Sequence, residues 1–177
     1  VDLRAAFDLV PRDALWDSLR SLGLPSPILG VLIRLHQCNY AGVRWGPNGE
    51  SSERIPVEQG VHQGCVLAPT LFSLFINEVI EVLNLCQHDS PVLNGQRVPA
   101  LLFADDTVLI SRTPKGLENL LSSFDTFCRI RGLEINRGKT KTMVLNPHSS
   151  FRGRIRLEGQ GLDLVTSFEY LGICLDM

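Results

Sequence analysis

Two adjacent aspartates interrupt an apolar segment near the middle of the chain. The segment LLFADDTVLI, residues 101–110, carries Asp105 and Asp106 between two short runs that have the composition of β-strands. Successive side chains of a strand point to opposite faces, so in an extended conformation at least one of these carboxylates would face the core. Burying an unpaired carboxylate is costly, and two neighbouring carboxylates repel each other. The chain must therefore place the pair either in a solvated turn or beside a cation.

Both interpretations of the aspartate pair have a physical basis. Asp is common in turns, which makes a solvated hairpin turn the simpler interpretation. The alternative is a divalent cation, because Mg²⁺ prefers hard oxygen ligands and usually takes one or two carboxylates together with substrate phosphates. The apolar flanks favour the cation, since they predict a buried hairpin that would hold the pair rigidly.

A site for two metal ions would need a third carboxylate, and Asp2 is the best candidate. It lies in VDLRAAFDLV, the other strand-like segment with an acidic residue in apolar company. Asp8 competes with it, but the two share one face only if the strand continues through both. Pro11 and the helical pattern that follows it argue against such a strand, so we interpret Asp8 as structural.

Composition sets the class of protein and excludes several functions. With 177 residues, 44% hydrophobic and 20% charged, the chain is typical of one globular domain. No apolar run approaches the roughly 18 residues of a membrane-spanning helix, and no signal peptide opens the chain. The five cysteines are scattered without a C-x-x-C pair; this argues against a disulfide framework and a zinc site, and fits a reducing intracellular compartment. Because the first residues read as a strand already under way, we expect a piece of a longer polypeptide.

Positive charge is concentrated in one segment. The net charge is −2, yet residues 128–158 carry eight Lys and Arg against two acidic residues. A solvated face is one interpretation of this segment, and contact with a phosphate backbone is the other.

Hydrophobic periodicity predicts a mixture of helices and short strands. Helices are expected over residues 12–22, 26–38, 68–85 and 115–131. Hairpins are expected over 43–57 around Asn48-Gly49, around Asn94-Gly95 and over 101–110, with further short strands at 141–145, 154–158 and 167–173. Consecutive hairpins without strict βαβ alternation predict an α+β fold, an antiparallel sheet with helices packed on one face.

Five ordered segments resemble the palm of a reverse transcriptase of the non-LTR, LINE-type retrotransposon family. They are DLRAAFD, GVHQGCVLAPTLF, FADD, GLEINRGKTK and FEYLGI, and together they cover essentially the whole chain. One such segment would be weak support, whereas five in order and spacing are specific. The resemblance implies an RNA-directed DNA polymerase with the polymerase palm fold. Residues 1–177 would form a single partial reverse transcriptase domain, the palm with the start of the primer-positioning region, lacking fingers and thumb.

The resemblance assigns catalysis to Asp2, Asp105, Asp106 and Lys139. The three aspartates would hold two Mg²⁺ ions, or Mn²⁺ in their place, about 3.5–4 Å apart, to activate the primer 3′-hydroxyl and bind the incoming triphosphate. This requires the Asp2 carboxylate to lie within coordination reach of the other two. Lys139 matches a family lysine that could bind pyrophosphate oxygens or protonate the leaving group. Lys141 is its close competitor, and an ordinary surface lysine is the alternative interpretation.

Further residues correspond to the family's substrate contacts. Phe7 aligns with the bulky residue under the deoxyribose, which selects dNTPs by excluding a 2′-hydroxyl; without the motif it would be interpreted as a core side chain. Gln63 and Gly64 match the segment beside the nascent base pair, where glycine allows close backbone approach. Phe103 stands where the family often has Tyr.

The resemblance also implies how the primer is held and what the partners are. Tyr170, Leu171 and Gly172 resemble the turn that positions the primer strand. The expected partners are an RNA template, a DNA primer and dNTPs, with no membrane; the oligomeric state is left open. Such an enzyme would act in the nucleus, although no targeting signal lies in these residues.

Two other functions were compared with this interpretation. A viral RNA-dependent RNA polymerase would be expected to have G-D-D and an acidic residue in place of Phe7, and neither is present. The remaining alternative is a decayed or repurposed retroelement fragment that binds nucleic acid without catalysis. We expect weak or no polymerase activity from residues 1–177 alone.

Overall fold

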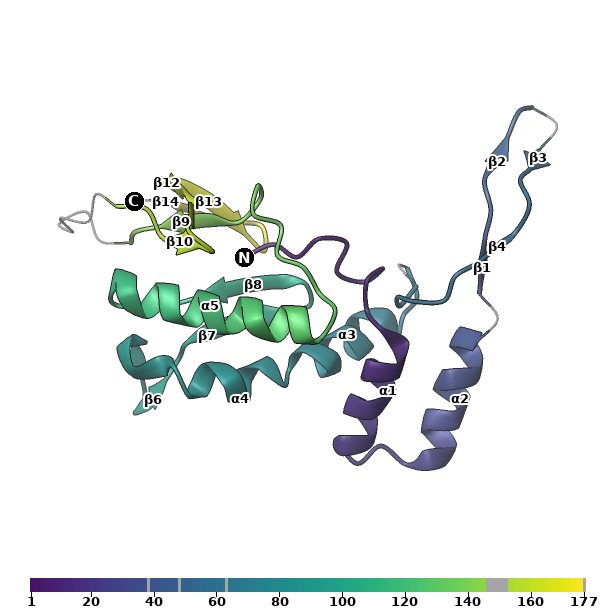
Figure 1. The fold of residues 1–177 in the computed structure, drawn as a ribbon, viewed down its shortest axis with the longest axis horizontal. Coiled ribbons are helices and arrows are strands. Elements are labelled where there is room, and N and C mark those ends of the chain that lie inside the picture. The colour runs from purple at the N-terminus through teal and green to yellow at the C-terminus, as the bar shows by residue number, and fades with distance from the viewer. Residues whose placement is uncertain (38, 48, 63, 146–152, 177) are drawn as a thin grey trace. The chain divides into compact units, whose positions relative to one another are not determined.

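The computed structural model describes residues 1–37, 39–47, 49–62, 64–145 and 153–176. Helices and short, mostly antiparallel strands are mixed along the chain, which is the α+β class expected (Figure 1). The chain divides into two compact units. We call Ala5–Ile76 the arm unit, and Val1–Arg4 together with Asn77–Met177 the sheet unit.

The arm unit begins with two helices that follow the predicted pattern. They are α1 (Arg12–Ser21) and α2 (Ser26–Gln37). Leu15, Trp16 and Leu19 are buried on one face of α1, as their spacing requires. Gly23 follows two residues after the end of the helix, with a φ of 81° that a residue with a side chain rarely adopts. Both helix predictions are therefore confirmed.

A long hairpin follows α2 and gives the arm unit its name. The strands β1 (Tyr40–Ala41) and β4 (Ile55–Pro56) pair near its base, and β2 (Arg44–Trp45) and β3 (Glu50–Ser51) pair near its tip. Figure 1 shows this hairpin extending beyond the helices of its own unit, which leaves side chains such as Trp45 exposed. The predicted hairpin is confirmed, although its turn residue Asn48 lies outside the described residues.

The single helix predicted over 68–85 is wrong. Two helices occupy this stretch, α3 (Ala68–Ile76) in the arm unit and α4 (Val79–Asn84) in the sheet unit. At the start of α4 the Ile80 and Glu81 N–H groups bond three residues back, to Asn77 and Glu78. The Glu78 carboxylate is bound by Arg131 at 3.1 Å. This contact lies at the point in the sequence where α3 ends and α4 begins.

The sheet unit is built around one long helix. Helix α5 (Pro114–Ile130) confirms the prediction for 115–131, and Thr113 caps it by accepting a hydrogen bond from the Gly116 N–H at 3.0 Å. Its fully buried side chains include Leu120 and Phe124. No helix among the described residues is both long and apolar enough to cross a bilayer.

The strands of the sheet unit pair two by two rather than forming one sheet. The pairs are β5 (Val92–Leu93) with β6 (Gln96–Arg97), β7 (Ala100–Phe103) with β8 (Asp106–Leu109), β9 (Lys141–Met143) with β12 (Asp163–Val165), β10 (Arg156–Leu157) with β11 (Gln160–Gly161), and β13 (Ser167–Tyr170) with β14 (Ile173–Asp176). The β9–β12 pair is parallel, whereas a wholly antiparallel sheet was predicted. The chain between β9 and β12 includes the β10–β11 hairpin, and β12 then runs in the same direction as β9. A pattern within one short strand cannot show the direction of its partner, so the sequence did not predict this parallel pair.

Candidate functional site

Asp105 and Asp106 lie at the tip of the β7–β8 hairpin. Phe103 pairs with Asp106, so Ala104 and Asp105 form a two-residue turn. Ala104 has a φ of 50°, in the left-handed region that costs a residue with a Cβ roughly 1–2 kcal/mol. Strain of this kind is concentrated at functional sites. Both aspartates are exposed, and the predicted turn between two short strands is confirmed.

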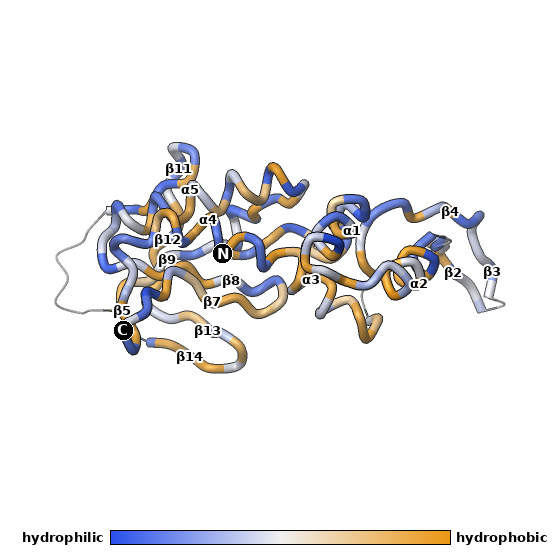
Figure 2. The backbone as a smooth tube through the Cα atoms, turned by 90° about the horizontal axis from the view of Figure 1, so that it is seen from below, coloured by the Kyte–Doolittle hydropathy of each residue, from blue (hydrophilic) through white to orange (hydrophobic). Residues whose placement is uncertain are grey.

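The hairpin that carries the aspartates is buried on one face only. Figure 2 shows β7 as a hydrophobic segment, yet Phe103 is 62% exposed and Leu101 is 45% exposed. The alternate side chains of the hairpin, such as Thr107 on β8, face inward and are buried. The prediction of a buried hairpin is therefore wrong for one face of β7, because alternation covers only every second side chain. Phe103 consequently presents its ring to solvent beside the aspartate turn.

The first four residues of the chain lie against the aspartate hairpin and against residues 134–140. The Val1 nitrogen donates to the Thr107 carbonyl at 2.7 Å. On the other side Leu3 forms an antiparallel bridge with Ile135. The flanking hydrogen bonds are Asn136 N–H to Asp2 O at 2.8 Å, Arg4 N–H to Glu134 O at 2.8 Å and Asp2 N–H to Thr140 Oγ1 at 3.1 Å. Residues 1–4 therefore lie between strand β8, which follows FADD, and the segment GLEINRGKTK.

The segments that carry the three carboxylates lie side by side, but their carboxylates are not arranged as a metal cage. None of them takes part in a salt bridge with the described residues. Across the described part of the chain, no group of three or more Asp, Glu, His or Cys side chains is arranged to hold a metal ion. The donors are nevertheless the hard oxygens that Mg²⁺ prefers, and Mg²⁺ usually needs only one or two carboxylates with water and phosphate. The donor chemistry fits the ion, and the coordination by Asp2, Asp105 and Asp106 stays a prediction.

Asp8 does not continue the strand of Asp2. Residues 4–9 form turns, so the extended segment ends at Leu3. This confirms the argument that the two aspartates do not share one strand face. The backbone of Asp8 instead lies against Gly60, where an added Cβ would stand 2.7 Å from the Asp8 carbonyl oxygen.

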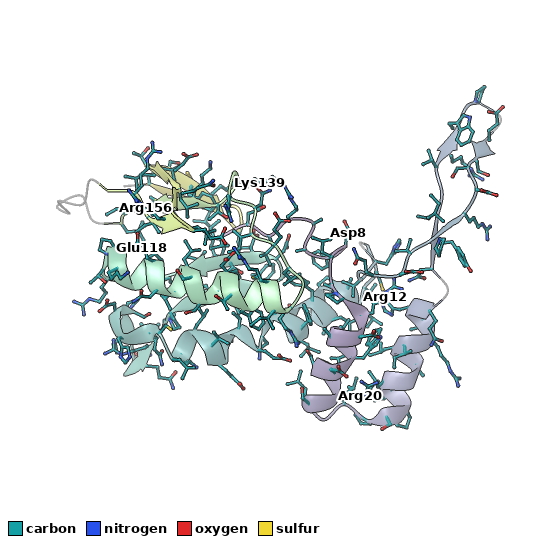
Figure 3. The ribbon with its side chains drawn as sticks, in the orientation of Figure 1. Asp8, Arg12, Arg20, Glu118, Lys139 and Arg156 are labelled. Carbon is teal, nitrogen blue, oxygen red and sulfur yellow. The ribbon has the colours of Figure 1, made fainter. Side chains whose placement is uncertain are left out.

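The structure separates the two candidate lysines. The Lys141 ammonium is held by the Asp163 carboxylate and by the Gly138 carbonyl, both at 2.8 Å, and this contact lowers the pKa of Asp163. Lys139 is exposed in a turn closed by the Thr140 N–H to Asn136 carbonyl bond at 2.9 Å (Figure 3). Since the Thr140 hydroxyl also accepts from Asp2, the Lys139 turn adjoins the Asp2 backbone. These contacts favour Lys139 as the lysine available to a substrate.

The hairpin of β13 and β14 brings a further predicted residue to this site. Leu171 and Gly172 form its two-residue turn with φ of 50° and 78°, the pattern of a type I′ turn. Tyr170 stands just before the turn and is half-buried. Burial, and then the negative charge of Asp106, raise the pKa of Tyr170. The structure therefore confirms a turn at these residues, while its role in positioning a primer stays a prediction. The charge of Asp106 acts on Tyr170, the residue before this turn.

Three other predicted site residues belong to the arm unit. The Phe7 ring lies 5.0 Å from that of Phe72, tilted by 37°, and is half-buried. Gly64 has a φ of 88° with open space where a Cβ would be. Gln63 lies outside the described residues. The substrate roles of all three stay predictions.

Much of the positive charge of segment 128–158 is used within the sheet unit. Arg129 pairs with Asp125 at 3.0 Å and also with Glu158, and Arg137 pairs with Glu158 as well. Arg131 pairs with Glu78. Sequence reasoning missed Glu158 as the residue that joins two arginines, because its partners are far from it in the sequence. Contact of the remaining cations with phosphates stays a prediction.

Comparison with known proteins identifies the family of the chain. The family described as reverse transcriptase (RNA-dependent DNA polymerase) matches residues 1–175. The retrovirus-related Pol polyprotein from type-2 retrotransposable element R2DM of Drosophila melanogaster is 30% identical over 191 aligned positions, covering 98% of this chain and 17% of that protein. The probable RNA-directed DNA polymerase from transposon BS of Drosophila melanogaster is 30% identical over 184 positions, covering 99% and 19%.

A third relative is also a retrotransposon polyprotein. The Pol polyprotein from a type-1 retrotransposable element R2 of Popillia japonica is 25% identical over 181 positions, covering 98% of this chain and 30% of that protein. The chain thus spans less than a third of the length of these curated relatives. Since the family match extends over nearly every residue, the chain belongs to the reverse transcriptase family.

Proposed function

We propose that this chain is the palm of an RNA-directed DNA polymerase of a non-LTR retrotransposon, which adds dNTPs to a primer 3′-hydroxyl on an RNA template. The observation that carries the proposal is the meeting of residues 1–4, the aspartate hairpin and residues 134–140 through hydrogen bonds of 2.7–3.1 Å. These are segments distant in sequence that a two-metal polymerase has to bring together.

The aspartates are the acidic part of the proposed site. Asp2, Asp105 and Asp106 would hold divalent ions, which supply charge neutralisation at the triphosphate and a lowered pKa at the attacking hydroxyl. The exposed turn leaves room for a triphosphate and for water in the remaining coordination positions. Asp2 is fixed at both its N–H and its carbonyl by residues 136 and 140, so its side chain starts from a rigid backbone.

Other residues of the sheet unit would handle the substrate. The Lys139 Nζ can donate a proton to the oxygen of the departing pyrophosphate. The exposed Phe103 ring offers an apolar surface beside the aspartates, and the Tyr170–Gly172 turn would support the primer end. From the arm unit, Phe7 would select the sugar, and Gln63 with Gly64 would contact the new base pair. These roles follow the resemblance, and the partners and a nuclear site of action are proposed with them.

Metal-dependent primer extension tests the proposal. The protein is expressed from its complete open reading frame and supplied with an RNA template, a DNA primer, dNTPs and either Mg²⁺ or Mn²⁺. Asp105→Asn keeps the size and removes the charge, and we expect it to lower extension by about a thousandfold because several kcal/mol of transition-state stabilisation are lost. Asp17→Asn is the matched control, since Asp17 is an exposed partner of Arg20 on α1.

The two negative outcomes have different meanings. Extension that survives in Asp105→Asn would remove this aspartate as a metal ligand. An unsubstituted protein that binds template and primer but extends with neither ion would refute the polymerase proposal and support the non-catalytic alternative.

A further inference from the structure

One arginine of the arm unit is bound entirely by backbone carbonyls. Arg12, the first residue of α1, is half-buried and directs its guanidinium at the chain on either side of the long hairpin (Figure 3). Its hydrogen bonds go to His36 O at 2.7 Å, Val57 O at 2.8 Å, Gly60 O at 3.0 Å and Gln59 O at 3.2 Å. The side chain therefore joins the end of α2 to residues 57–60.

No other side chain could make this set of contacts. Guanidinium carries five N–H donors in a rigid plane, whereas a lysine ammonium is a single point with three. Among the described residues Arg12 has no salt-bridge partner, and burial lowers its pKa. Holding a cation without a counter-charge has a desolvation cost, which the four carbonyl bonds offset only while all of them are made.

Residues 57–61 are fastened from their other side to residues 7–10. The Gly60 N–H donates to the Val10 carbonyl at 2.9 Å, and the Val61 N–H donates to the Phe7 carbonyl at 2.8 Å. Gly60 approaches the Asp8 backbone so closely that a Cβ would stand 2.7 Å from the Asp8 oxygen. The backbone of Phe7 is therefore held by a segment that Arg12 holds in turn.

We propose that Arg12 is a positioning residue for nucleotide selection, which fixes the Phe7 backbone through residues 57–61. This inference rests on the proposed polymerase function, in which Phe7 excludes a 2′-hydroxyl. Steric selection of this kind depends on sub-ångström placement, since a misplacement of 1 Å can cost about a hundredfold in rate. Loosening the segment should therefore impair the choice of sugar more than it impairs folding.

The experiment measures sugar selection in two matched variants of α1. Arg12→Lys keeps the charge and loses the planar fork, and Arg20→Lys makes the same change at an exposed arginine of the same helix that pairs with Asp17. Both are made in the protein expressed from its complete open reading frame. The readouts are kcat and KM for dNTP and rNTP separately, together with the thermal unfolding midpoint. Phe7→Ala calibrates the ratio expected when the selecting ring is absent.

We expect Arg12→Lys to lower the dNTP-to-rNTP ratio of kcat/KM by about tenfold, mainly through a lower KM for rNTP, while Arg20→Lys leaves the ratio unchanged. An unchanged ratio in Arg12→Lys, beside a clear fall in Phe7→Ala, would overturn the proposal. If Arg12→Lys does not fold, Arg12→Gln, which keeps a planar donor pair, is measured by the same ratio and decides in the same way. A parent enzyme without any extension would instead refute the polymerase function itself.

Discussion

Replacing Gly60 by alanine tests the closest backbone approach in the arm unit. Gly60 has a φ of 83°, and an added Cβ would stand 2.7 Å from the Asp8 oxygen, 2.9 Å from its Cα and 3.0 Å from its carbonyl carbon. All three are backbone atoms, so no rotamer change can relieve the contact. Alanine would therefore have to displace either residues 7–10 or residues 57–61.

The expected loss of stability has two parts. A residue with a Cβ in the left-handed region costs roughly 1–2 kcal/mol. Overpacking against atoms that cannot rotate away adds roughly 1–3 kcal/mol. Gly23→Ala is the matched control, because Gly23 has a φ of 81° with nothing within 4 Å of an added Cβ. The difference between the two variants, about 1–3 kcal/mol, isolates the contact with Asp8.

Urea unfolding followed by tryptophan fluorescence is a suitable assay. The chain has two tryptophans, Trp16 and Trp45, and both belong to the arm unit. Trp16 is 6% exposed, so its emission reports the packing of α1. Equal free energies of unfolding for Gly60→Ala and Gly23→Ala would refute the close approach, and with it the fastening of residues 57–61 on which the role of Arg12 depends.

Three further predictions concern the sheet unit and the start of the chain. Lys139→Ala should lower the extension rate by about a hundredfold or more in single-turnover measurements if it is the general acid, whereas Lys141→Ala should change it several-fold at most. Asp2→Asn should abolish extension while Asp8→Asn retains most of it, and equal losses would show that Asp2 has been wrongly preferred. Burial, and then the charge of Asp125, raise the pKa of Cys128 to about 12 from 9.0, so the folded state keeps a proton that the unfolded state releases. Stability should fall as pH rises above about 9, by up to about 1.4 kcal/mol per pH unit, and urea titrations of Cys128→Ala should lose this slope.

The sequence predicted correctly those helices that end at a residue close to them in the chain. The ends of α1 and α5 depend on Gly23 and Gly132, which a reader of the sequence can see. At the break between α3 and α4, by contrast, Glu78 is bound by Arg131 from 53 positions away, a contact that no local pattern shows. The buried residues of α3 and α4 keep helical spacing across Asn77 and Glu78, so periodicity alone predicted one helix where the chain passes from one unit to the other.

The candidate site was predictable in its residues and only partly in its geometry. Asp105 and Asp106 were placed in a turn because two like charges cannot both enter a core. Asp2 was chosen for its strand-like apolar setting and again from the family resemblance, but no short-range pattern could show that residue 1 contacts residue 107. The role of Arg12 could not be predicted, because its four hydrogen-bond acceptors are backbone carbonyls and any residue type can supply a carbonyl.

The ion pairs of the sheet unit also explain how a site rich in carboxylates can sit beside a basic segment. Arg129, Arg131, Arg137 and Lys141 lie in the segment that contacts residues 2–4, and each is paired with a carboxylate other than those of the site. A cation that turned instead toward Asp2 or the aspartate hairpin would compete with a divalent ion for the same oxygens. Internal pairing therefore does more than stabilise the unit: it keeps these four positive charges occupied, so that they do not compete with a divalent ion for the proposed aspartate ligands, while Lys139 is left exposed.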